Sequence, residues 1–489
     1  MYALLIIISI LQSTYQSDVD LSDVKIWGPG LEPQNLVLPA RYFFLQTNLS
    51  KLNDNISFKV NGLSLDKKRP CRVWSNILNR KDGSYIMRYK LYDSCSYMEI
   101  NVKYKDIHLA KSPYIIDNIV HPEQCICPKW NVNEWLDNMK CAKLPKQISR
   151  DLSQFKTIDF DKLRKKIIDK YNKPQSISLC HYVIFENKVY RTCYGKYVGF
   201  KMFMDNILLS MTRKLFLPNM EFFVNLGDWP LVNDISEKYP IMSWCGSTDS
   251  FDIIMPTYDI TESTLENMGR VMLDMLSVQG NNDRSWDEKE PVAFWRGRDS
   301  NAARLKLIEI AKDNPDMFNA SLTNFFFYRD QEAKYGPKSE HISFYKFFDY
   351  KYQVSIDGTV AAYRFPYLLA GGSLVLKQKS KYYEHFYNDL KPNVHYIPVE
   401  KDLSDLLDKL KWAMQNDEEA RIIANNARHY SNENLLPKDI YCYHAHLFNE
   451  YSKLLVSSVN IIEGMDIVEQ PPEAQVCQCG TNTLHKDEL

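Results

Sequence analysis

The chain has 489 residues, which is long enough for two or three domains because single hydrophobic cores stop growing well before that length. Its 60 Lys and Arg residues balance 61 Asp and Glu residues, so bulk charge gives no reason to expect nucleic acid or a membrane surface as a partner. A content of 45% hydrophobic and 13% aromatic residues is typical of an ordered globular protein.

The first sixteen residues have the pattern of a cleaved signal peptide. Residues 2–11 (YALLIIISIL) form an apolar block that is too short to span a bilayer and is followed by polar residues. No basic residue precedes the block, and a buried first strand is the alternative interpretation. No other stretch reaches the roughly 18 apolar residues of a membrane span. We therefore expect a soluble mature protein without a membrane anchor.

The chain ends in HKDEL, the address that the KDEL receptor reads to return proteins to the endoplasmic reticulum. Together with the signal peptide, this address predicts a location in the lumen of the endoplasmic reticulum. The residues of the address are Lys486, Asp487, Glu488 and Leu489. Sequons for N-glycosylation occur at Asn48, Asn55 and Asn319.

Eleven cysteines in an oxidising lumen are expected to form disulfides, and the odd number leaves at least one of them free. The sequence has no pair of CxxC motifs and no Cys/His finger spacing, so we expect no metal site built from cysteine. Two CxC pairs, at 125–127 and 477–479, are interpreted as sulfurs that bridge to distant partners.

Residues 20–118 show the pattern of a β-sandwich. Short segments with alternating hydrophobicity, such as 37–46, 56–60 and 85–91, are separated by turns rich in Asn, Asp, Gly and Lys. The motifs WGPGL and PARYF resemble those of filamin-type immunoglobulin-like repeats, which usually serve as binding or spacing modules. Cys71 and Cys95 are candidates for a disulfide within this domain.

After a linker at about 121–145 the hydrophobic period changes from two to 3.6. Six apolar residues between Phe200 and Met211 form one stripe of a helix, and a strand follows at 222–226. Further strands are predicted at 292–295, 352–356 and 373–376, and further helices at 302–311, 360–369 and 403–414. Asn416 and Glu419 suggest a capping box at the start of another helix. The pattern predicts a parallel sheet with helices on both faces.

In such sheets, ligands bind beyond the carboxyl ends of the strands. The first loop there, LGDWP at residues 226–230, places Asp228 directly after a buried strand. Two roles compete for this carboxylate: a turn residue that bonds nearby backbone, or a chemical group held at the rim of the sheet.

Two further strand-to-helix loops carry arginines. In WRGRDS, residues 295–300, Gly297 lets backbone approach a ligand, and Arg304 lies in the first turn of the next helix. The alternative there is a surface cluster of arginines around Asp299. The loop at 356–364 has small residues at its centre and ends on Arg364. Two such loops in one half of the chain suggest a shared diphosphate ligand.

The order of six motifs, followed by KDEL, resembles the KDEL-containing protein O-glucosyltransferases of glycosyltransferase family 90. The resemblance covers nearly the whole mature chain. The motifs are VNLGDWP, SWCGSTDSFDIIMPTY, FWRGRDS, DGTVAAYRFPYLL, YYEHFY and HYIPV.

The resemblance implies an inverting enzyme of the GT-B type, with two Rossmann-like halves over residues 121–460 and a tail over 461–489. It implies transfer of glucose from UDP-glucose to serine on folded EGF-like repeats, with no cofactor and no bound metal. Asp228 takes the place of the catalytic base, and Cys442 pairs with Cys125 or Cys127. The implied donor-binding residues are Arg298, Arg304, Thr359, Val360, Ala361, Ala362, Tyr363 and Arg364.

Two other functions remain open on the sequence. A xylosyl donor is a variant of the same reaction, since sugar choice can turn on a few pocket residues. A non-catalytic protein that holds clients in the endoplasmic reticulum is the rival from a different class. The retention of Asp228, Arg304 and Arg364 favours an enzyme, because a binding protein has no need of all three.

Overall fold

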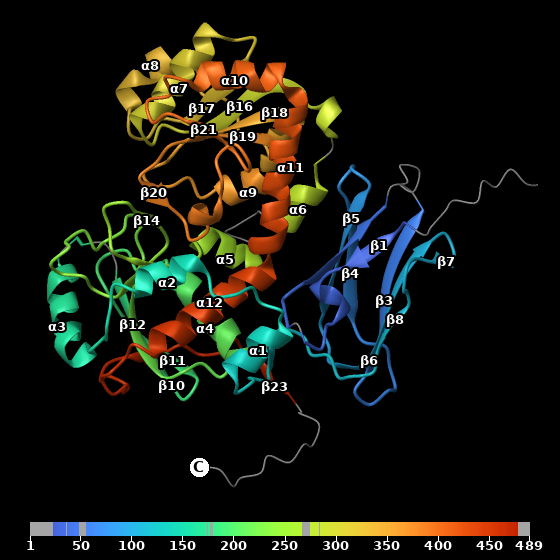
Figure 1. Cartoon of the computed structure of the whole chain (residues 1–489). Helices are drawn as coiled ribbons and strands as arrows, with labels where there is room; N and C mark the ends of the chain where they lie inside the picture. Colours follow the sequence, from blue (N-terminus) through green and yellow to red (C-terminus); the bar gives the residue numbers. More distant parts are fainter. Residues whose placement is uncertain are drawn as a thin grey trace, which may run out of the picture.

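The computed structural model describes residues 23–477, apart from residues 36, 48–54, 174, 177–178, 267–273 and 283. The predictions for residues 1–16, for Asn48 and for Lys486–Leu489 lie outside the described residues. Among the helices that the structure describes, none combines the length and the apolar composition needed to cross a bilayer. The described chain forms a β-sandwich followed by two α/β halves (Figure 1).

The N-terminal sandwich consists of two antiparallel sheets, as the period of two predicts. One sheet has the order β1-β2-β5-β4, and the other contains β3, β6, β7 and β8. The strands are β1 Lys25–Trp27, β2 Arg41–Gln46, β3 Ile56–Ser64, β4 Val73–Asn79, β5 Ser84–Leu91, β6 Cys95–Tyr104, β7 Ile107–His108 and β8 Tyr114–Ile116. The predicted disulfide between Cys71 and Cys95 is confirmed, with Cα atoms 5.9 Å apart.

The first α/β half contains a six-stranded sheet of order β15-β13-β12-β10-β11-β22. Its strands are β10 Leu179–Phe185, β11 Lys188–Tyr194, β12 Met220–Asn225, β13 Ile241–Ser243, β15 Ile253–Ile254 and β22 Asp466–Ile467. The prediction of a wholly parallel sheet is wrong here, because only β12, β13 and β15 are parallel. Glu186 and Asn187, both with positive φ, connect β10 to β11, and a two-residue turn of this kind forces an antiparallel pair.

The second half contains a five-stranded parallel sheet of order β17-β16-β18-β19-β21. Its strands are β16 Glu290–Arg298, β17 Phe318–Asn324, β18 Tyr350–Ser355, β19 Leu374–Gln378 and β21 Ile397–Val399. Neighbouring residues of β16 face opposite sides, with Phe294 packed in the same cluster as Phe365 of α9 (Phe365–Ala370) and Trp295 in that of Leu305. Helices therefore cover both faces, as predicted.

The remaining elements connect or cover these sheets. The other helices are α1 Val132–Asn138, α2 Lys146–Leu152, α3 Phe160–Tyr171, α4 Lys201–Lys214, α5 Tyr258–Thr264, α6 Met275–Gly280, α7 Ala302–Asp313, α8 Glu332–Tyr335, α10 Leu406–Gln415, α11 Asp417–Asn434 and α12 Pro437–Ser452. Short 3-10 helices are η1 Pro29–Leu31, η2 Trp286–Glu288, η3 Arg329–Gln331, η4 Phe344–Asp349 and η5 Tyr387–Asp389. Two further strand pairs are β9 Cys125–Ile126 with β23 Gln475–Val476, and β14 Gly246–Ser247 with β20 Tyr382–Tyr383. The second of these pairs joins the two halves.

Two helix starts differ from the prediction. The helix predicted at 360–369 begins later, as α9, so that Pro366 lies in its first turn. A longer helix would place Pro366 in its interior, where proline has no N–H to donate to the Ala362 carbonyl. The predicted capping box at α11 is also absent, because the Asn416 amide donates to the Trp412 carbonyl at 2.8 Å instead.

The sandwich packs directly against the α/β part of the chain. On β2, Phe43 lies in the core between the two sheets, whereas Tyr42 and Phe44 belong to the large apolar cluster that extends through both α/β halves. An ion pair joins Arg428 of α11 to Asp82 at 2.6 Å. Figure 1 shows β4 and β5 beside α6 and α11. An apolar interface, and not the linker alone, therefore fixes the position of the sandwich.

The disulfide partners of the last helix differ from those that the family resemblance implied. Cys442 of α12 pairs with Cys141, and Cys127 pairs with Cys477. Cys141 follows α1, which packs against α12, whereas the parallel pairing of β9 with β23 places Cys127 next to the tail. Cys125 is buried and forms no disulfide with any cysteine among residues 23–477 that the structure describes. The prediction that Cys442 pairs with Cys125 or Cys127 is therefore wrong.

Candidate active site between the two halves

Three loops at the carboxyl ends of β12, β16 and β18 carry the predicted site residues. In the second half, the chain leaves β16 toward β17 on one side and continues through β18 on the other. Open parallel sheets bind ligands at such a reversal of strand order. The region between the loops after β16 and β18, called the crevice below, is therefore the candidate site. The loop after β12 contacts the loop after β18 through Tyr363, whose hydroxyl lies 3.5 Å from the Asp228 carbonyl oxygen.

The turn that delivers Asp228 is made by another residue. The side-chain oxygen of Asn225, at the end of β12, accepts a hydrogen bond from the Gly227 N–H at 2.9 Å. The Asn225 amide donates to the Trp229 carbonyl at 2.6 Å. Since Asn225 performs this turn-forming role, the Asp228 carboxylate is not needed for it.

The chain that leaves this loop is anchored by a second buried carboxylate. Asp252 accepts hydrogen bonds from the backbone N–H groups of Leu231 and Val232 at 2.8 and 2.9 Å. Ser243 donates to Asp252 at 2.6 Å and accepts from the Asn225 amide at 3.1 Å. The loop is thus fixed at both ends by one network of hydrogen bonds, which limits its movement.

The Asp228 carboxylate is half-buried and has no hydrogen-bond donor among the described residues. Burial raises the pKa of this carboxyl above its ordinary value, and Arg298 of the second half partly opposes the rise. Its backbone carbonyl accepts from the buried Cys245 thiol at 3.2 Å as well as from Tyr363. A carboxylate with a raised pKa and a free oxygen is suited to accept a proton from a bound hydroxyl.

Arg304 is buried and clamps the two loops of the second half together. Its guanidinium donates to the carbonyl oxygens of Asp357 at 2.8 Å, Arg298 at 2.9 Å and Ile356 at 3.3 Å. A fourth hydrogen bond reaches the Ser300 hydroxyl at 3.1 Å. Arg304 therefore holds together the two loops that carry the predicted donor-binding residues, and its guanidinium already bonds groups of those loops.

Arg298 and Arg364 lie closer to the opening. Arg298 is exposed at the end of β16, and Arg364 donates to the Arg296 carbonyl at 2.5 Å. A Cβ atom on Gly297 would lie 2.6 Å from the Trp295 ring and 3.3 Å from the Arg364 guanidinium. Glycine at this position is therefore what allows Arg364 to approach the strand end.

The buried guanidinium groups of Arg304 and Arg364 have disfavoured charges. Burial, together with neighbouring arginines that include Arg298, lowers the pKa of Arg304 to about 9 and that of Arg364 to about 10. One carboxyl group faces Arg364: burial raises the pKa of Asp259 to about 7, and Arg364 opposes that rise. An anion bound here would relieve this repulsion, so the crevice is suited to a diphosphate.

The segment between Gly358 and Arg364 combines buried and accessible side chains. Residues 360–362 are buried, while Thr359 and Tyr363 are partly exposed. The Gly358 N–H donates to the Val360 carbonyl at 2.8 Å, which folds the segment into a tight turn. The crevice can therefore receive backbone atoms and apolar volume from the buried residues Val360, Ala361 and Ala362. It can receive accessible side-chain atoms from Thr359 and Tyr363.

The alternative of a surface cluster around Asp299 is wrong. Asp299 is fully buried, and its carboxylate accepts hydrogen bonds from the backbone N–H groups of three consecutive residues, Phe326, Phe327 and Tyr328, at 2.6 to 2.8 Å. It thereby fixes the segment after β17 beside the loop after β16.

A fully buried carboxyl group, Glu384, lies near the junction of the halves. The Tyr387 hydroxyl donates to it at 3.2 Å. Burial raises the pKa of Glu384 to about 8, and the Asp259 carboxyl adds to the rise. Glu384 is therefore mostly protonated at neutral pH, which makes it less suited than Asp228 to accept a proton.

The described glycosylation candidates differ in accessibility. Asn55 is exposed next to β3. Asn319 lies within β17, where its amide donates to the Tyr350 hydroxyl at 2.9 Å and its oxygen accepts from Arg296 at 2.6 Å. A glycan on Asn319 would have to displace these contacts.

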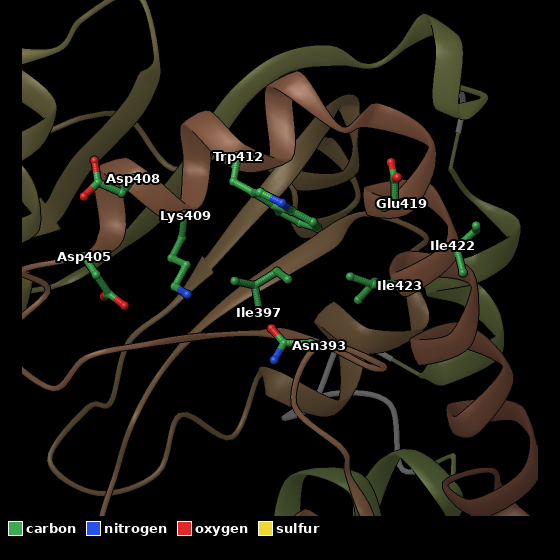
Figure 2. Close-up of a pocket in the computed structure, with 9 residues that line it drawn as sticks. All are labelled: Asn393, Ile397, Asp405, Asp408, Lys409, Trp412, Glu419, Ile422 and Ile423. Atoms are coloured by element: carbon green, nitrogen blue, oxygen red, sulfur yellow. The ribbon is translucent and has the colours of Figure 1, made fainter.

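Two other features do not belong to this crevice. His121, Cys127 and Cys477 have the proximity of a metal site, but the two cysteines are bonded to each other. A hollow of about 700 Å³ lies between β21, α10 and α11, and Figure 2 shows Trp412 and Ile423 facing it. None of the predicted site residues lines this hollow.

Sequence reasoning missed the residues that position the site. Asn225 could have been found from its place at a strand end two residues before glycine, the pattern of an Asx turn. Asp252 lies in the quoted motif SFDIIMP but has no local signal of its role. The packing of the two halves brings three further residues near the site: Cys245, Asp259 and Glu384.

Known proteins resemble this chain along almost its whole length. The model of the Glycosyl transferase family 90 matches residues 136–487, and that of the Filamin/ABP280 repeat matches residues 18–115. Protein O-glucosyltransferase 2 of Danio rerio is 47% identical over 96% of this chain and 94% of its own length. Protein O-glucosyltransferase 3 of Homo sapiens is 44% identical over 95% of this chain and 94% of its own.

The alignment with a solved structure, the crystal structure of TarM, covers 84% of this chain and 75% of the TarM chain. The sequence identity is 10% and the TM-score is 0.31, so nothing is inferred from this likeness. The family match spans well over half of the chain, and its relatives align from end to end. The chain is a glycosyltransferase that belongs to glycosyl transferase family 90, with a filamin repeat in front of the catalytic part.

Proposed function

We propose that the protein transfers glucose from UDP-glucose to a serine hydroxyl of folded EGF-like repeats, with inversion at the anomeric carbon. The observation that carries this proposal is the Asp228 carboxylate of one half, which no described residue hydrogen-bonds, with Arg298 of the other half as its electrostatic neighbour. Two relatives aligned over 94% of their length are named protein O-glucosyltransferases. The predicted signal peptide and the C-terminal sequence HKDEL support action in the lumen of the endoplasmic reticulum.

In this reaction Asp228 accepts the serine proton while the serine oxygen bonds to the anomeric carbon of glucose. The bond between that carbon and the diphosphate oxygen breaks, and UDP leaves with the electron pair. Arg298 and Arg364 stabilise the negative charge that develops on the leaving group, and the burial of Arg364 strengthens its interaction with that charge. Positive charge from arginine takes the place of a metal ion in this proposal.

The raised pKa of Asp228 strengthens it as a base at neutral pH. Inversion follows from direct displacement, because one carboxylate acts as a base and needs no covalent intermediate. Two other carboxyl groups are less suited to that role. The pKa of Asp259 is raised to about 7, so this group is partly protonated at neutral pH, and that of Glu384 is raised to about 8, so this group is largely protonated.

The experiment compares donors and acceptors on the purified protein. UDP-glucose and UDP-xylose are each supplied with a folded EGF-like repeat, with the same repeat after reduction, and with a Ser→Ala repeat. Glucose transfer to the folded serine repeat alone is the expected result. Xylose transfer in its place would establish the xylosyl variant, and binding of the repeat without transfer from either donor would establish a client-binding protein.

A further inference from the structure

A second hollow lies between the sandwich and α11, and none of the catalytic residues lines it. Its volume is about 380 Å³. The outer face of the β1-β2-β5-β4 sheet forms one side, and α11 forms the other (Figure 1). Its lining includes Trp27, Phe44, Arg80, Asn425, Asn426 and Arg428, together with the carboxylates of Asp82 and Glu433.

The carboxylates that line this hollow have other partners than Arg80: Glu433 lies 3.0 Å from the His429 ring nitrogen. Asp82 pairs with Arg428 at 2.6 Å, and its other oxygen accepts from the Ser84 N–H and hydroxyl at 3.0 and 2.5 Å. Arg80 lies over the Phe44 ring, 4.7 Å from its centroid. Within the described part of the chain, buried Nε and Nη2 of Arg80 have no hydrogen-bond partner.

Buried donors without partners are costly. Burial, together with the charge of Arg428, lowers the pKa of Arg80 to about 9. An anion bound beside Arg80 would supply the missing acceptor for its free N–H groups and favour its charged form. A carboxylate fits this need because its two oxygens match the planar guanidinium.

An exposed aromatic ring lies next to this charge. Trp27 is 47% exposed, and its ring centroid lies 5.7 Å from that of Phe44, on which Arg80 rests. The side chains of Asn425 and Asn426 line the same hollow from α11. A flat apolar ring, a guanidinium and amide groups match the C–H face, the carboxylate and the hydroxyl groups of an acidic sugar.

We propose that the hollow between the sandwich and α11 binds a carboxylate-bearing pyranose, such as a uronic acid unit of a glycan. Arg80 pairs with the carboxylate, Trp27 stacks on the ring, and the amides of Asn425 and Asn426 bond the hydroxyl groups. A hollow of this size lies in the usual range for small-molecule sites. The site is separate from the catalytic crevice and does not depend on the proposed reaction.

The test is a saturation-transfer NMR titration of the full-length protein with methyl glucuronide, with methyl glucoside as the neutral matched sugar. We expect glucuronide to bind with a Kd on the order of 1 mM, as single sugars held by few contacts do, and glucoside at least about tenfold more weakly. Arg80→Gln and Trp27→Ala should each weaken glucuronide binding about tenfold or more. Lys81→Gln, which removes an exposed charge from the next residue, is the control and should bind as the native chain does.

Several results would overturn the proposal: no binding of glucuronide, equal binding of the two sugars, or unchanged binding by Arg80→Gln. Stronger binding of N-acetylglutamate amide than of glucuronide would also overturn it, in favour of an acidic peptide. Melting temperatures are measured on each variant. If Arg80→Gln is destabilised, Trp27→Ala and the comparison of the two sugars on the native chain decide the outcome, because the Trp27 side chain is exposed.

Discussion

Replacing Arg304 by Lys tests whether this residue is a clamp of the donor loops. The guanidinium donates four hydrogen bonds, three of them to carbonyl oxygens of two different loops. A lysine ammonium retains the charge but reaches fewer of these acceptors, so we count two hydrogen bonds lost. Hydrogen bonds from charged groups contribute roughly 1.5–3 kcal/mol each, which gives a loss of about 3–6 kcal/mol. We expect a melting temperature lower by about 5 °C or more, together with weaker UDP binding.

Arg298→Gln is the matched variant, because the Arg298 side chain is exposed and has no hydrogen-bond partner among the described residues. It should leave the melting temperature within about 1 °C of the native value while weakening UDP binding. The assays are differential scanning fluorimetry and calorimetric titration with UDP. If Arg304→Lys loses UDP binding about 100-fold and melts like the native protein, Arg304 is a direct ligand and the clamp is refuted.

Three further predictions concern pH, disulfides and metal. Glu384 has a pKa of about 8 in the folded protein and its ordinary pKa of 4.5 in the unfolded chain, so between these pH values unfolding releases its proton. The contribution of Glu384 to the free energy of unfolding therefore falls as pH rises from 4.5 to about 8. Between pH 5.5 and 7.5, Glu384→Gln should therefore gain stability over the native protein by about 1.4 kcal/mol per pH unit, and chemical unfolding at both pH values that finds a constant difference would contradict this. Peptide mapping should recover Cys141 linked to Cys442, and a free thiol at either residue would remove that bond from the account. Transfer should persist in EDTA, and a loss of activity that Mn²⁺ restores would show a metal requirement.

The sequence was sufficient to locate the loops of the site, because each follows a strong local pattern. The stripe from Phe200 predicted α4, and apolar segments ending on glycine turns predicted β12, β16 and β18. Since parallel strands present their carboxyl ends at one edge of a sheet, the placement of Arg298 and Arg364 at the same edge of the second sheet followed from the strand assignments. Asp228 follows β12 of the first sheet, and its position opposite these arginines depends on how the two halves pack.

The details that failed depend on contacts between distant segments. Arg304 is near a helix start, and no local pattern shows that its side chain turns back to carbonyl groups of a loop more than fifty residues away. The pairing of Cys442 depends on which helix packs against α12, and the choice between Cys127 and Cys141 is made by that packing. By contrast, Pro366 and the turn at 186–187 were local signals that a closer interpretation could have used.

The central claim is that Asp228 is the base that accepts the serine proton. Asparagine has the size of aspartate but cannot accept a proton, and neither the turn nor any hydrogen bond among the described residues requires the carboxylate. Asp228→Asn should therefore fold and bind UDP-glucose normally. The most direct measurement is the rate of glucose transfer to a folded EGF-like repeat by Asp228→Asn, with its melting temperature and UDP-glucose affinity measured on the same preparation. The account predicts a rate lower by about 10² to 10⁴ with both other values unchanged, and a variant that transfers glucose at nearly the native rate would contradict it.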